Sequence, residues 1–315
     1  MPQMTPSQAR VIDPILTEVA RGYGGNQSAV ADVLFPIVPV AQRAGRVISF
    51  GADDFKLYTT TRAPGANTRR VQFGYASDTY ALADYSLEGA VPVELMQEAD
   101  AVPGIDLGAN AVRSVRNIMS LEREKQAADL ALNASNYGDS NKVTLSSNDR
   151  WDVYNHTDSN PYQDINTGKE AVRGQIGRRP NVLVVGPKVL SALRSHPKIL
   201  DRLSTATDRP PATLAQLAAL FELERVIEGG AVYHNGTAFV DVWGTYALLA
   251  YTTPASLAEM GSPNLGYTYQ LNDYPIVEDP YFDRNTKSWY YPVTDARVPV
   301  LAGAAAGYLI TTAVS

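Results

Sequence analysis

The apolar positions of the chain are spaced most regularly in one long stretch, from Ile105 to Gly138, which contains no proline. Apolar side chains recur there every three or four residues, as on one face of a helix. They form a first set and, after a lateral shift, a second set: Leu107, Ala111, Val115, Ile118 and Met119, then Leu121, Ala128 and Leu132. Asp106 is the expected N-cap and Gly138 the expected end. Such a helix would be about 45–50 Å long, more than a small core can cover, so we expect a sheet to lie against it.

Strand-like alternation predominates before this helix, from Val47 to about Pro103. Apolar residues flank a turn-rich segment, Ala63 to Asn67, which predicts a hairpin with its tip there. The flanking residues are Phe55, Leu57, Tyr58, Val71, Phe73 and Tyr75. Little sequence nearby could cover the apolar side of this hairpin, so we expect it to project and to rest on another subunit.

Three arginines crowd the tip of that hairpin, Arg62, Arg69 and Arg70, whereas acidic residues lie toward its base. Ordinary solvated charge explains such a pattern as well. In an assembly of identical subunits, however, the same pattern would supply complementary ends that set the register between neighbours. We therefore name these three arginines as candidate inter-subunit contacts.

The first stretch of the chain, up to about Arg46, combines helix-compatible residues with an extended apolar segment around Pro36 and Pro39. A proline lacks the N–H group that a central strand donates, so this segment is not predicted as a central strand. We expect an arm whose apolar side chains lie either on the chain's own body or on a neighbouring subunit. Phe35 and Ile37 are the candidate contacts.

A compact unit that mixes helix and strand is predicted in the second half of the chain. A helix from Thr167 to Arg179 precedes a short buried strand from Val182 to Val185, and Gly186 and Pro187 turn the chain into another helix. The apolar residues of that helix share one face: Val189, Leu190 and Leu193. Asn235-Gly236 marks the turn of a later hairpin.

The chain carries no charged side chain from Val298 to its end. A membrane span is one interpretation, but Pro299, two glycines and several alanines make the segment weakly apolar, and no basic residue follows it. We predict buried strands that return to pack on the long helix. The expected fold class is α+β.

Composition narrows the classes of function. The chain of 315 residues is 45% hydrophobic, enough for a sizeable core in two or more structural regions. The absence of cysteine excludes disulfides and thiolate metal sites, and nothing at the N-terminus resembles a secretory signal, so we expect an intracellular origin. The net charge of −6 argues against tight, general nucleic-acid binding by the whole chain, although not against enclosing DNA without gripping it.

No residue pattern predicts catalysis or a metal site. His156, His196 and His234 lie in differently predicted regions, and none has the i, i+4 spacing of a helical metal pair. The polar run from Tyr137 to Asn166 lacks the central glycine and closing glutamate of a calcium loop. Neither a GxxxxGK(S/T) phosphate loop nor a GxSxG elbow occurs. We expect no catalytic, cofactor-binding or metal-ligating residue; an intracellular enzyme with an unrecognised site is a weaker alternative.

Several loose motifs follow one another in a fixed order over most of the chain: VLFPIVPVAQRAGRVISF, the hairpin, LEREKQAADLAL, NVLVVGPKVLSALRSHP, VDVWGTYALLAYTTP and a terminal strand pair. This order resembles the major capsid protein of tailed bacteriophages. The resemblance implies an α+β fold of the Hong Kong 97 type. It places an N-terminal arm at 1–46, an extended loop at 47–103, a peripheral domain with a long spine helix at 104–177 and 263–315, and an axial domain at 178–262.

The resemblance also implies a function. Members of this family assemble as hexamers and pentamers into an icosahedral shell around packaged double-stranded DNA, so we expect a virion protein made in the bacterial cytoplasm, with no cofactor and no membrane. The expected partners are other copies of the chain, a separate scaffolding protein, a portal and a decoration protein. Encapsulins share the fold and are the closest alternative, since they enclose a protein cargo instead of a genome.

Some members of the family join subunits covalently through a lysine of the extended loop. Lys56 is the only lysine before Lys125, but it lies several residues from the hairpin tip. Arg62 and Arg69 are both closer to the tip than Lys56 is. Arginine cannot be deprotonated to act as the nucleophile. We therefore expect non-covalent contacts alone. The arm and loop consume the roughly hundred residues before the long helix, so we also expect a separate scaffold and no trimming of the N-terminus.

Overall fold

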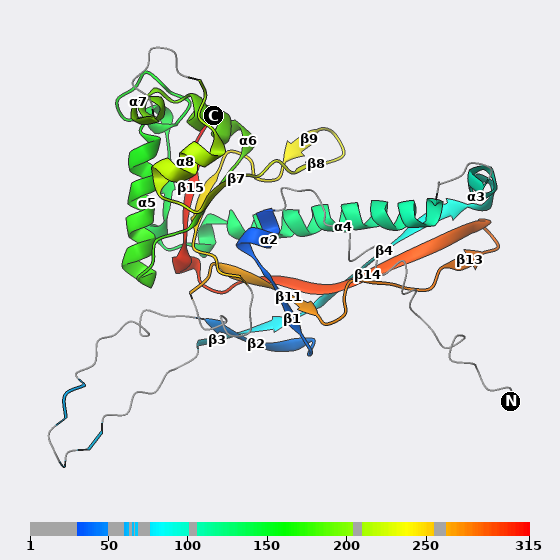
Figure 1. The fold of residues 1–315 in the computed structure, drawn as a ribbon. Helices are drawn as coiled ribbons and strands as arrows, with labels where there is room; N and C mark the ends of the chain where they lie inside the picture. The colour runs from blue at the N-terminus through cyan, green and yellow to red at the C-terminus, as the bar shows by residue number, and fades with distance from the viewer. Residues whose placement is uncertain are drawn as a thin grey trace.

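The computed structural model describes residues 30–49, 60–62, 65, 67–68, 76–100, 106–203, 210–254 and 263–315. Its helices are α2 (Val30–Leu34), α3 (Val93–Asp100), α4 (Leu107–Ala131), α5 (Pro161–Ile176), α6 (Pro187–Ser195), α7 (Pro197–Leu203) and α8 (Leu214–Phe221). Its strands are β1 (Ile37–Val40), β2 (Ala44–Ser49), β3 (Ala76–Ala81), β4 (Ala83–Pro92), β5 (Lys142–Thr144), β6 (Val182–Val185), β7 (Arg225–Glu228), β8 (Val232–His234), β9 (Phe239–Asp241), β10 (Ala247–Ala250), β11 (Gly266–Leu271), β12 (Ile276–Val277), β13 (Tyr281–Asp283), β14 (Ser288–Leu301) and β15 (Gly307–Thr311). These residues form an extended part, built on α4 and β14, and a compact part at one end of α4 (Figure 1).

The long helix α4 connects the two parts. Asp106 is its N-cap, as predicted, and its carboxylate accepts the backbone N–H of Ala109 at 2.9 Å. The helix ends at Ala131, not at Gly138. It is therefore about 37 Å long, shorter than the sequence predicts.

Side chains beyond the last turn stop α4 early. The carbonyl oxygen of Leu130 accepts the side-chain amide of Asn136, and that of Ala131 accepts the hydroxyl of Tyr137, both at 2.8 Å. These bonds satisfy two of the last carbonyl groups, which have no partner within the helix. The chain then continues in short 3-10 turns, and Gly138 precedes one of them instead of ending the helix.

The extended part is a sheet of six strands with β14 at its centre. One edge of β14 pairs with β4, and the other pairs in turn with β13, β12 and β11. Helix α4 lies along one face of this sheet (Figure 1), which confirms the expected sheet against the helix. The contact is an apolar cluster of Val91, Val112, Val115, Met119, Val277, Tyr291 and Val293. Gly108 of α4 allows the close approach, because a Cβ there would lie 2.8 Å from the ring of Tyr291.

The segment around the two prolines forms α2 and then the edge strand β1, which is parallel to β11. The carbonyl oxygens of Pro36 and Val40 accept the backbone N–H groups of Thr268 at 3.0 Å and Asn272 at 2.9 Å. In a parallel pair, alternate residues of a strand direct their backbone groups toward the neighbouring strand. Pro36 and Val40 face β11, so the backbone of Pro39 faces the opposite, open edge, and its missing N–H group costs no hydrogen bond within the sheet. The described part of the arm thus lies on the chain's own body, one of the two predicted alternatives.

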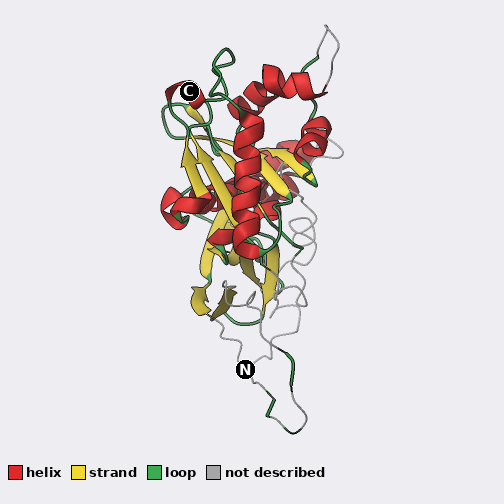
Figure 2. Cartoon of the chain, turned by 90° about the vertical axis from the view of Figure 1, so that its left-hand side faces the viewer, coloured by secondary structure: helices red, strands yellow, loops and turns green. Residues whose placement is uncertain are grey.

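The compact part surrounds a five-stranded sheet in the order β5-β15-β10-β6-β7. All residues of β6 and β10 are buried, because both faces of this sheet are covered. Helix α5 lies across one face (Figure 2) and shares an apolar cluster with α6 and α8. The other face packs on α2 and on the last turns of α4. The predicted strand Val182–Val185 and the helix after it, with its buried apolar face, are confirmed.

Two small antiparallel pairs lie outside these sheets. Strands β2 and β3 pair over all six residues of each and form the base of the predicted extended hairpin. The predicted tip lies largely outside the described residues. Strands β8 and β9 form the hairpin predicted at Asn235-Gly236. Its loop has four residues, because His234 pairs with Phe239, and the Asn235 side chain accepts the backbone N–H of Ala238 at 2.9 Å.

Helix α5 begins earlier than predicted, at Pro161 instead of Thr167. The side chain of Asn160 caps its first turn, and a proline is well suited to the first helical position because its φ is already helical. The helix ends at Ile176, since Gly177 takes a left-handed conformation with φ of 67°.

The two terminal strands, predicted as a pair that packs on α4, lie in different sheets. Strand β14 is in the extended sheet under α4, whereas β15 pairs with β10 and β5 in the compact sheet. The predicted domain boundaries stay a prediction, but one apolar cluster crosses them. Helix α5 and strand β15, predicted in the peripheral segments 104–177 and 263–315, contribute Ile165, Val172 and Ile310 to the same core as β6. Burial of these apolar residues draws three separate segments into the compact part.

Candidate functional site

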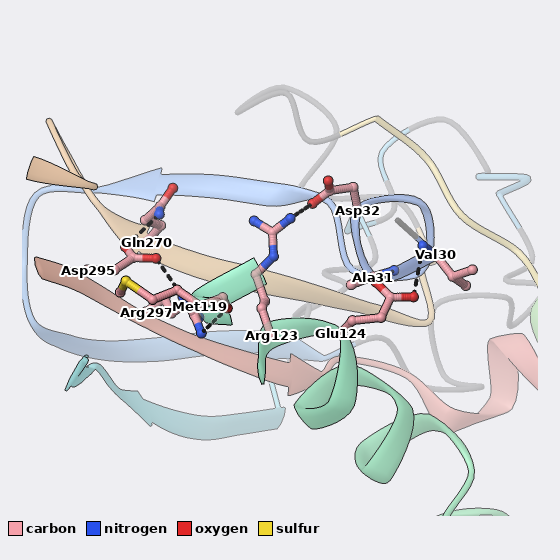
Figure 3. A network of polar contacts seen from close by, with 9 residues as sticks. All are labelled: Val30, Ala31, Asp32, Met119, Arg123, Glu124, Gln270, Asp295 and Arg297. Carbon is pink, nitrogen blue, oxygen red and sulfur yellow. Dashed lines mark hydrogen bonds and ion pairs between the residues drawn. The ribbon is translucent and has the colours of Figure 1, made fainter. Parts of the chain in front are cut away.

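A buried carboxylate joins the arm, the long helix and the compact part, and Figure 3 shows its contacts with the arm. Glu124 of α4 is only 5% exposed. It accepts the backbone N–H groups of Val30 at 3.0 Å and Ala31 at 2.9 Å, and the indole N–H of Trp243 at 2.7 Å. The first two are free N–H groups at the start of α2, and Trp243 follows β9 in the compact part. One side chain therefore fixes three segments, and we call this group the Glu124 joint.

Burial raises the pKa of Glu124, while its three donors and the nearby Arg123 act in the opposite direction by stabilising the carboxylate. Arg123 is the preceding residue of α4 and forms an ion pair with Asp32 of α2 (Figure 3). The helix α2 is thus held on α4 both through its backbone and through a side chain. The joint is a structural connection, with no nucleophile among its members.

A second buried network holds α4 on the extended sheet (Figure 3). Arg297 of β14 is 1% exposed and donates to Asp295 at 2.7 Å and to the backbone carbonyl of Met119 at 3.3 Å. Asp295 also accepts the side-chain amide of Gln270 at 2.7 Å, and the guanidinium lies 4.6 Å from the ring centre of Tyr85. A buried ion pair adds little net stability because both charges lose water, but losing one partner is costly. We infer that this network fixes the position of the helix on the sheet.

The histidines do not form a catalytic or metal site. Burial lowers the pKa of His196 from 6.5 to about 4, so its ring is neutral at pH 7. Its Nδ1 accepts the backbone N–H of Lys198 at 3.2 Å, so Nε2 carries the proton and donates to the hydroxyl of Ser159 at 3.1 Å. A serine nucleophile would need that nitrogen as an acceptor. His156 and His234 lie in other segments, and among the described residues no three His, Asp or Glu side chains are grouped to hold a metal.

Comparison with known proteins distinguishes the remaining classes of function. Residues 111–252 match the family model described as phage major capsid protein E. Over 310 residues the chain is 32% identical to the major capsid protein of Burkholderia phage BcepMu, with 97% of each chain covered. This chain belongs to the phage major capsid protein family.

Solved structures agree with this assignment. A phage-related protein from Bordetella bronchiseptica is 44% identical to this capsid protein, with a TM-score of 0.79 and coverage of 97% of this chain and 98% of that chain. The SrpI encapsulin of Synechococcus elongatus has a TM-score of 0.54 over 91% of this chain and 87% of its own, at 12% identity. A likeness at that identity concerns the fold alone. The α+β fold of the Hong Kong 97 type is confirmed, and the encapsulin alternative has less support.

As a major capsid protein of the tailed phages, the chain is a component of the virion and forms the head shell by assembling with other copies. The family is structural, so the enzyme alternative is wrong. None of the described helices combines the length and apolar composition of a membrane span. The functional surfaces of a capsid protein are those through which its subunits contact one another.

Only some of the predicted contact residues lie on the surface of this capsid protein. Phe35 is fully buried in the apolar cluster that α2 shares with α4, so its position does not fit a contact with a neighbour. Ile37 on β1 is half-buried. Arg62 is exposed, whereas Arg69 and Arg70 lie outside the described residues. The contacts of Ile37 and of the three arginines stay predictions.

Sequence reasoning missed several exposed apolar side chains. They lie on the extended part and on the hairpin β8–β9: Leu87, Leu95, Ile118, Val232, Phe239, Tyr281, Phe282 and Trp289. Ile118, predicted in the buried stripe of α4, is 58% exposed, and Phe239 is 77% exposed. One signal was available: the run YFDRNTKSWYY places aromatic residues on both faces of a tight hairpin, and a single core cannot cover both faces. Exposed apolar groups of this kind are candidate subunit contacts.

Proposed function

We propose that many copies of this capsid protein close into an icosahedral shell made of hexamers and pentamers, and that the shell encloses packaged double-stranded DNA. The net charge of −6 supports a shell that surrounds DNA without sequence-specific binding, because tight DNA binding depends on cationic side chains that neutralise phosphates. Family membership and the uneven burial of the two sheets support the proposal.

Strand β4 is the observation that carries this proposal. It has ten residues and pairs with β14 along one edge. Within the described ranges no strand pairs with its other edge. Val91 is the only buried residue of the ten. Soluble proteins usually shorten or cover an open strand edge, because its unpaired backbone groups can pair with another chain. We infer that the long open edge of β4 has a partner outside the subunit, which a neighbouring subunit in a shell would supply.

The hairpin formed by β2 and β3 supports the same proposal. Within the subunit this pair contacts the extended sheet through Tyr80, whose ring stacks on that of Tyr269 with centres 4.4 Å apart. A pair of strands alone is at best marginally stable in water, so a neighbour that covers the rest of the hairpin would add stability. We propose that Arg62, Arg69 and Arg70 near the hairpin tip, together with Ile37 on β1, contact adjacent subunits. The shell would then be stabilised by area summed over many interfaces.

Other components of the phage head are part of the proposal. We infer a separate scaffolding protein, a portal and a decoration protein as partners, and synthesis in the cytoplasm of the bacterial host. The support is the resemblance of the whole chain to tailed-phage capsid proteins, together with the assembly of related chains into shells.

The size and shape of the assembled particles test the proposal of a shell. The chain is expressed in bacteria with the other head proteins of its phage, and the product is sized and imaged by electron cryomicroscopy. Icosahedral particles that contain DNA after packaging are expected. A stable monomer or dimer under all assembly conditions would contradict the shell, and particles filled with a specific protein cargo would favour the encapsulin alternative.

We propose further that only non-covalent contacts hold the shell. Lys56, the sole candidate for a covalent link on the loop, lies outside the described residues. Mature particles boiled in SDS should give one band near 34.1 kDa on a denaturing gel. A ladder of larger covalent species would overturn this proposal without affecting the shell itself.

A further inference from the structure

The end of the extended part that is remote from the compact part carries charges of opposite sign on two adjacent elements. Helix α3 presents Glu94 and Glu98, both exposed. The turn between β13 and β14 presents Arg284 and Lys287, also exposed. The two elements are adjacent, because the backbone N–H of Val93 donates to the carbonyl of Lys287 at 3.0 Å, and Figure 1 shows both at the far end of α4.

The fold of a single subunit does not use these charges. In the described part of the chain, none of the four forms an ion pair. The acid of the same turn, Asp283, is occupied, because it accepts the backbone N–H of Asn285 at 2.9 Å and the hydroxyl of Thr286 at 3.1 Å. Glu94 suits the first turn of its own helix, but Glu98 lies in the last turn, where the helix dipole disfavours a negative charge. A partner outside the subunit would account for Glu98.

Exposed apolar side chains accompany the charges. Leu95 of α3 is 50% exposed, Phe282 of β13 40% and Trp289 of β14 36%. The two aromatic rings are in contact, with centres 5.6 Å apart. Trp289 is directly paired with Val91, so both rings lie on the face of the sheet that α4 covers farther along. An aromatic centre with a charged rim is the usual composition of a protein interface.

We propose that this end of the subunit binds the same end of a neighbouring copy, with the acidic helix α3 of one copy against the basic turn β13–β14 of the next and with Phe282 and Trp289 buried between them. The inference rests on the proposed function, since it needs neighbours in a shell. The occupant is a second copy because the acidic and basic patches complement each other and stand at the same end of each subunit.

The geometry of the contact follows from the difference between its two patches. Each copy offers α3 on one side and the basic turn on the other, so the contact is heterologous. Copies related by such a contact follow one another around an axis, and in a closed shell the rotation between them completes a ring. Every subunit in the ring then has its exposed aromatic pair covered and both charged patches neutralised.

Charge reversal tests the contact. The pair Arg284→Glu with Lys287→Glu, and the pair Glu94→Lys with Glu98→Lys, each place like charges against each other at every such contact. We expect each pair to lower the yield of particles at least about tenfold. The variant with all four changes exchanges the two signs, so it should recover most of the wild-type yield.

The wild-type chain, expressed in parallel, keeps this test separate from that of the proposed function. If the wild type forms particles and both reversed pairs do so at full yield, the inference is overturned and the shell stands. Failure of a folded four-change variant to recover overturns it as well. If the wild type itself forms no particles, the proposed function fails, and this inference fails with it.

Tryptophan accessibility gives an independent readout. The chain has three tryptophans, of which Trp151 and Trp243 are 0% and 1% exposed. In unassembled subunits of the charge-reversed variants, Trp289 should therefore supply the fluorescence that acrylamide quenches. In wild-type particles Trp289 should be covered, so this quenchable component of the fluorescence should be absent. Trp289→Phe is the matched control, since it lacks the component in both states. Equal quenching of Trp289 in particles and in free subunits would overturn the inference.

Discussion

The compact and extended parts of this capsid subunit are built on sheets that are covered to very different degrees. In the compact part, helices lie on both faces, and β6 and β10 are buried at every residue. In the extended part, α4 lies along one face, and β4 buries one of its ten residues. The first sheet is stabilised by apolar burial within its own chain, whereas the second leaves its edge strand β4 exposed although its inner strand β11 is buried at five of six residues. We therefore propose that the compact sheet contributes most to the stability of the subunit and that the exposed edge of the extended sheet contacts other subunits.

A cavity in the compact part should have the largest effect. Phe221→Ala removes a ring that is fully buried, so we expect the free energy of unfolding to fall by about 3–5 kcal/mol. Phe239→Ala is the matched control, because that ring is 77% exposed on the hairpin β8–β9, and its cost should stay below about 0.5 kcal/mol. Urea unfolding of unassembled subunits measures both. Equal losses would contradict the assignment of stability to the buried core of the compact part.

Loss of the acceptor at the Glu124 joint should come next. Glu124→Leu leaves two backbone N–H groups and the indole N–H of Trp243 without a partner, so we expect a cost of about 2–4 kcal/mol and faster proteolysis near Val30. Asp129→Leu, an acid-to-leucine change at an exposed position of the same helix, removes only a surface ion pair with Lys125 and should cost less than about 1 kcal/mol. Urea unfolding and limited proteolysis compare the two; similar results would show that the joint is not a structural connection.

The pH dependence of stability should be smaller and localised in the compact part. The folded-state pKa of His196, about 4, lies below its unfolded value of 6.5. The unfolded chain thus binds more protons between these values, and the free energy of unfolding should rise by up to about 3 kcal/mol as the pH rises from 4 to 6.5. The same stability is lost as the pH falls. His196→Gln can still donate to Ser159 but does not titrate, so it should remove this contribution. Urea unfolding at several pH values between 4 and 6.5 measures the free energy of unfolding of both proteins. If the variant and the wild type depend on pH equally, the prediction is wrong.

Changes on the projecting hairpin should have the smallest effect on the subunit and a large one on assembly. Arg62→Glu, Arg69→Glu and Arg70→Glu together should change the free energy of unfolding by less than about 0.5 kcal/mol, because surface charges contribute little to folding. Particles should be lost, because like charges would then meet at the contact. Circular dichroism and sizing measure the two effects separately. Normal particles from the triple variant would remove these arginines from the list of contacts.

The local elements of both parts were predictable because their causes lie within a few residues. Asp106 caps α4, Gly186 and Pro187 turn β6 into α6, and Asn235-Gly236 begins the four-residue loop of the hairpin β8–β9. The start of α5 was also encoded locally, by the N-cap Asn160 and a proline after it, but the polar run around it resembled a loop. The end of α4 needed side chains that fold back from beyond the helix, which spacing alone does not reveal.

The joint and the exposed faces were not predictable in the same way. Glu124 lies in the charged run LEREK, which is typical of a solvated helix surface, and its partners are 93 to 119 residues away in the sequence. Ile118 fits the apolar spacing of α4, yet the sheet covers a face that does not include it. Helical periodicity identifies residues that share a face, but the partner of that face is decided by tertiary packing.

The proline of the edge strand β1 has a consequence for the accuracy of assembly. Backbone hydrogen bonding between strands does not depend on side chains, so an open strand edge accepts correct and incorrect partners alike. Pro39 offers no N–H on the outward edge of β1, which leaves only Ile37 able to donate there. A misplaced copy therefore finds one donor fewer along this edge and pairs with it more weakly, so recognition there depends more on side chains, whose fit differs between right and wrong neighbours. Incorrect encounters at β1 should dissociate quickly, before they become trapped in a growing shell.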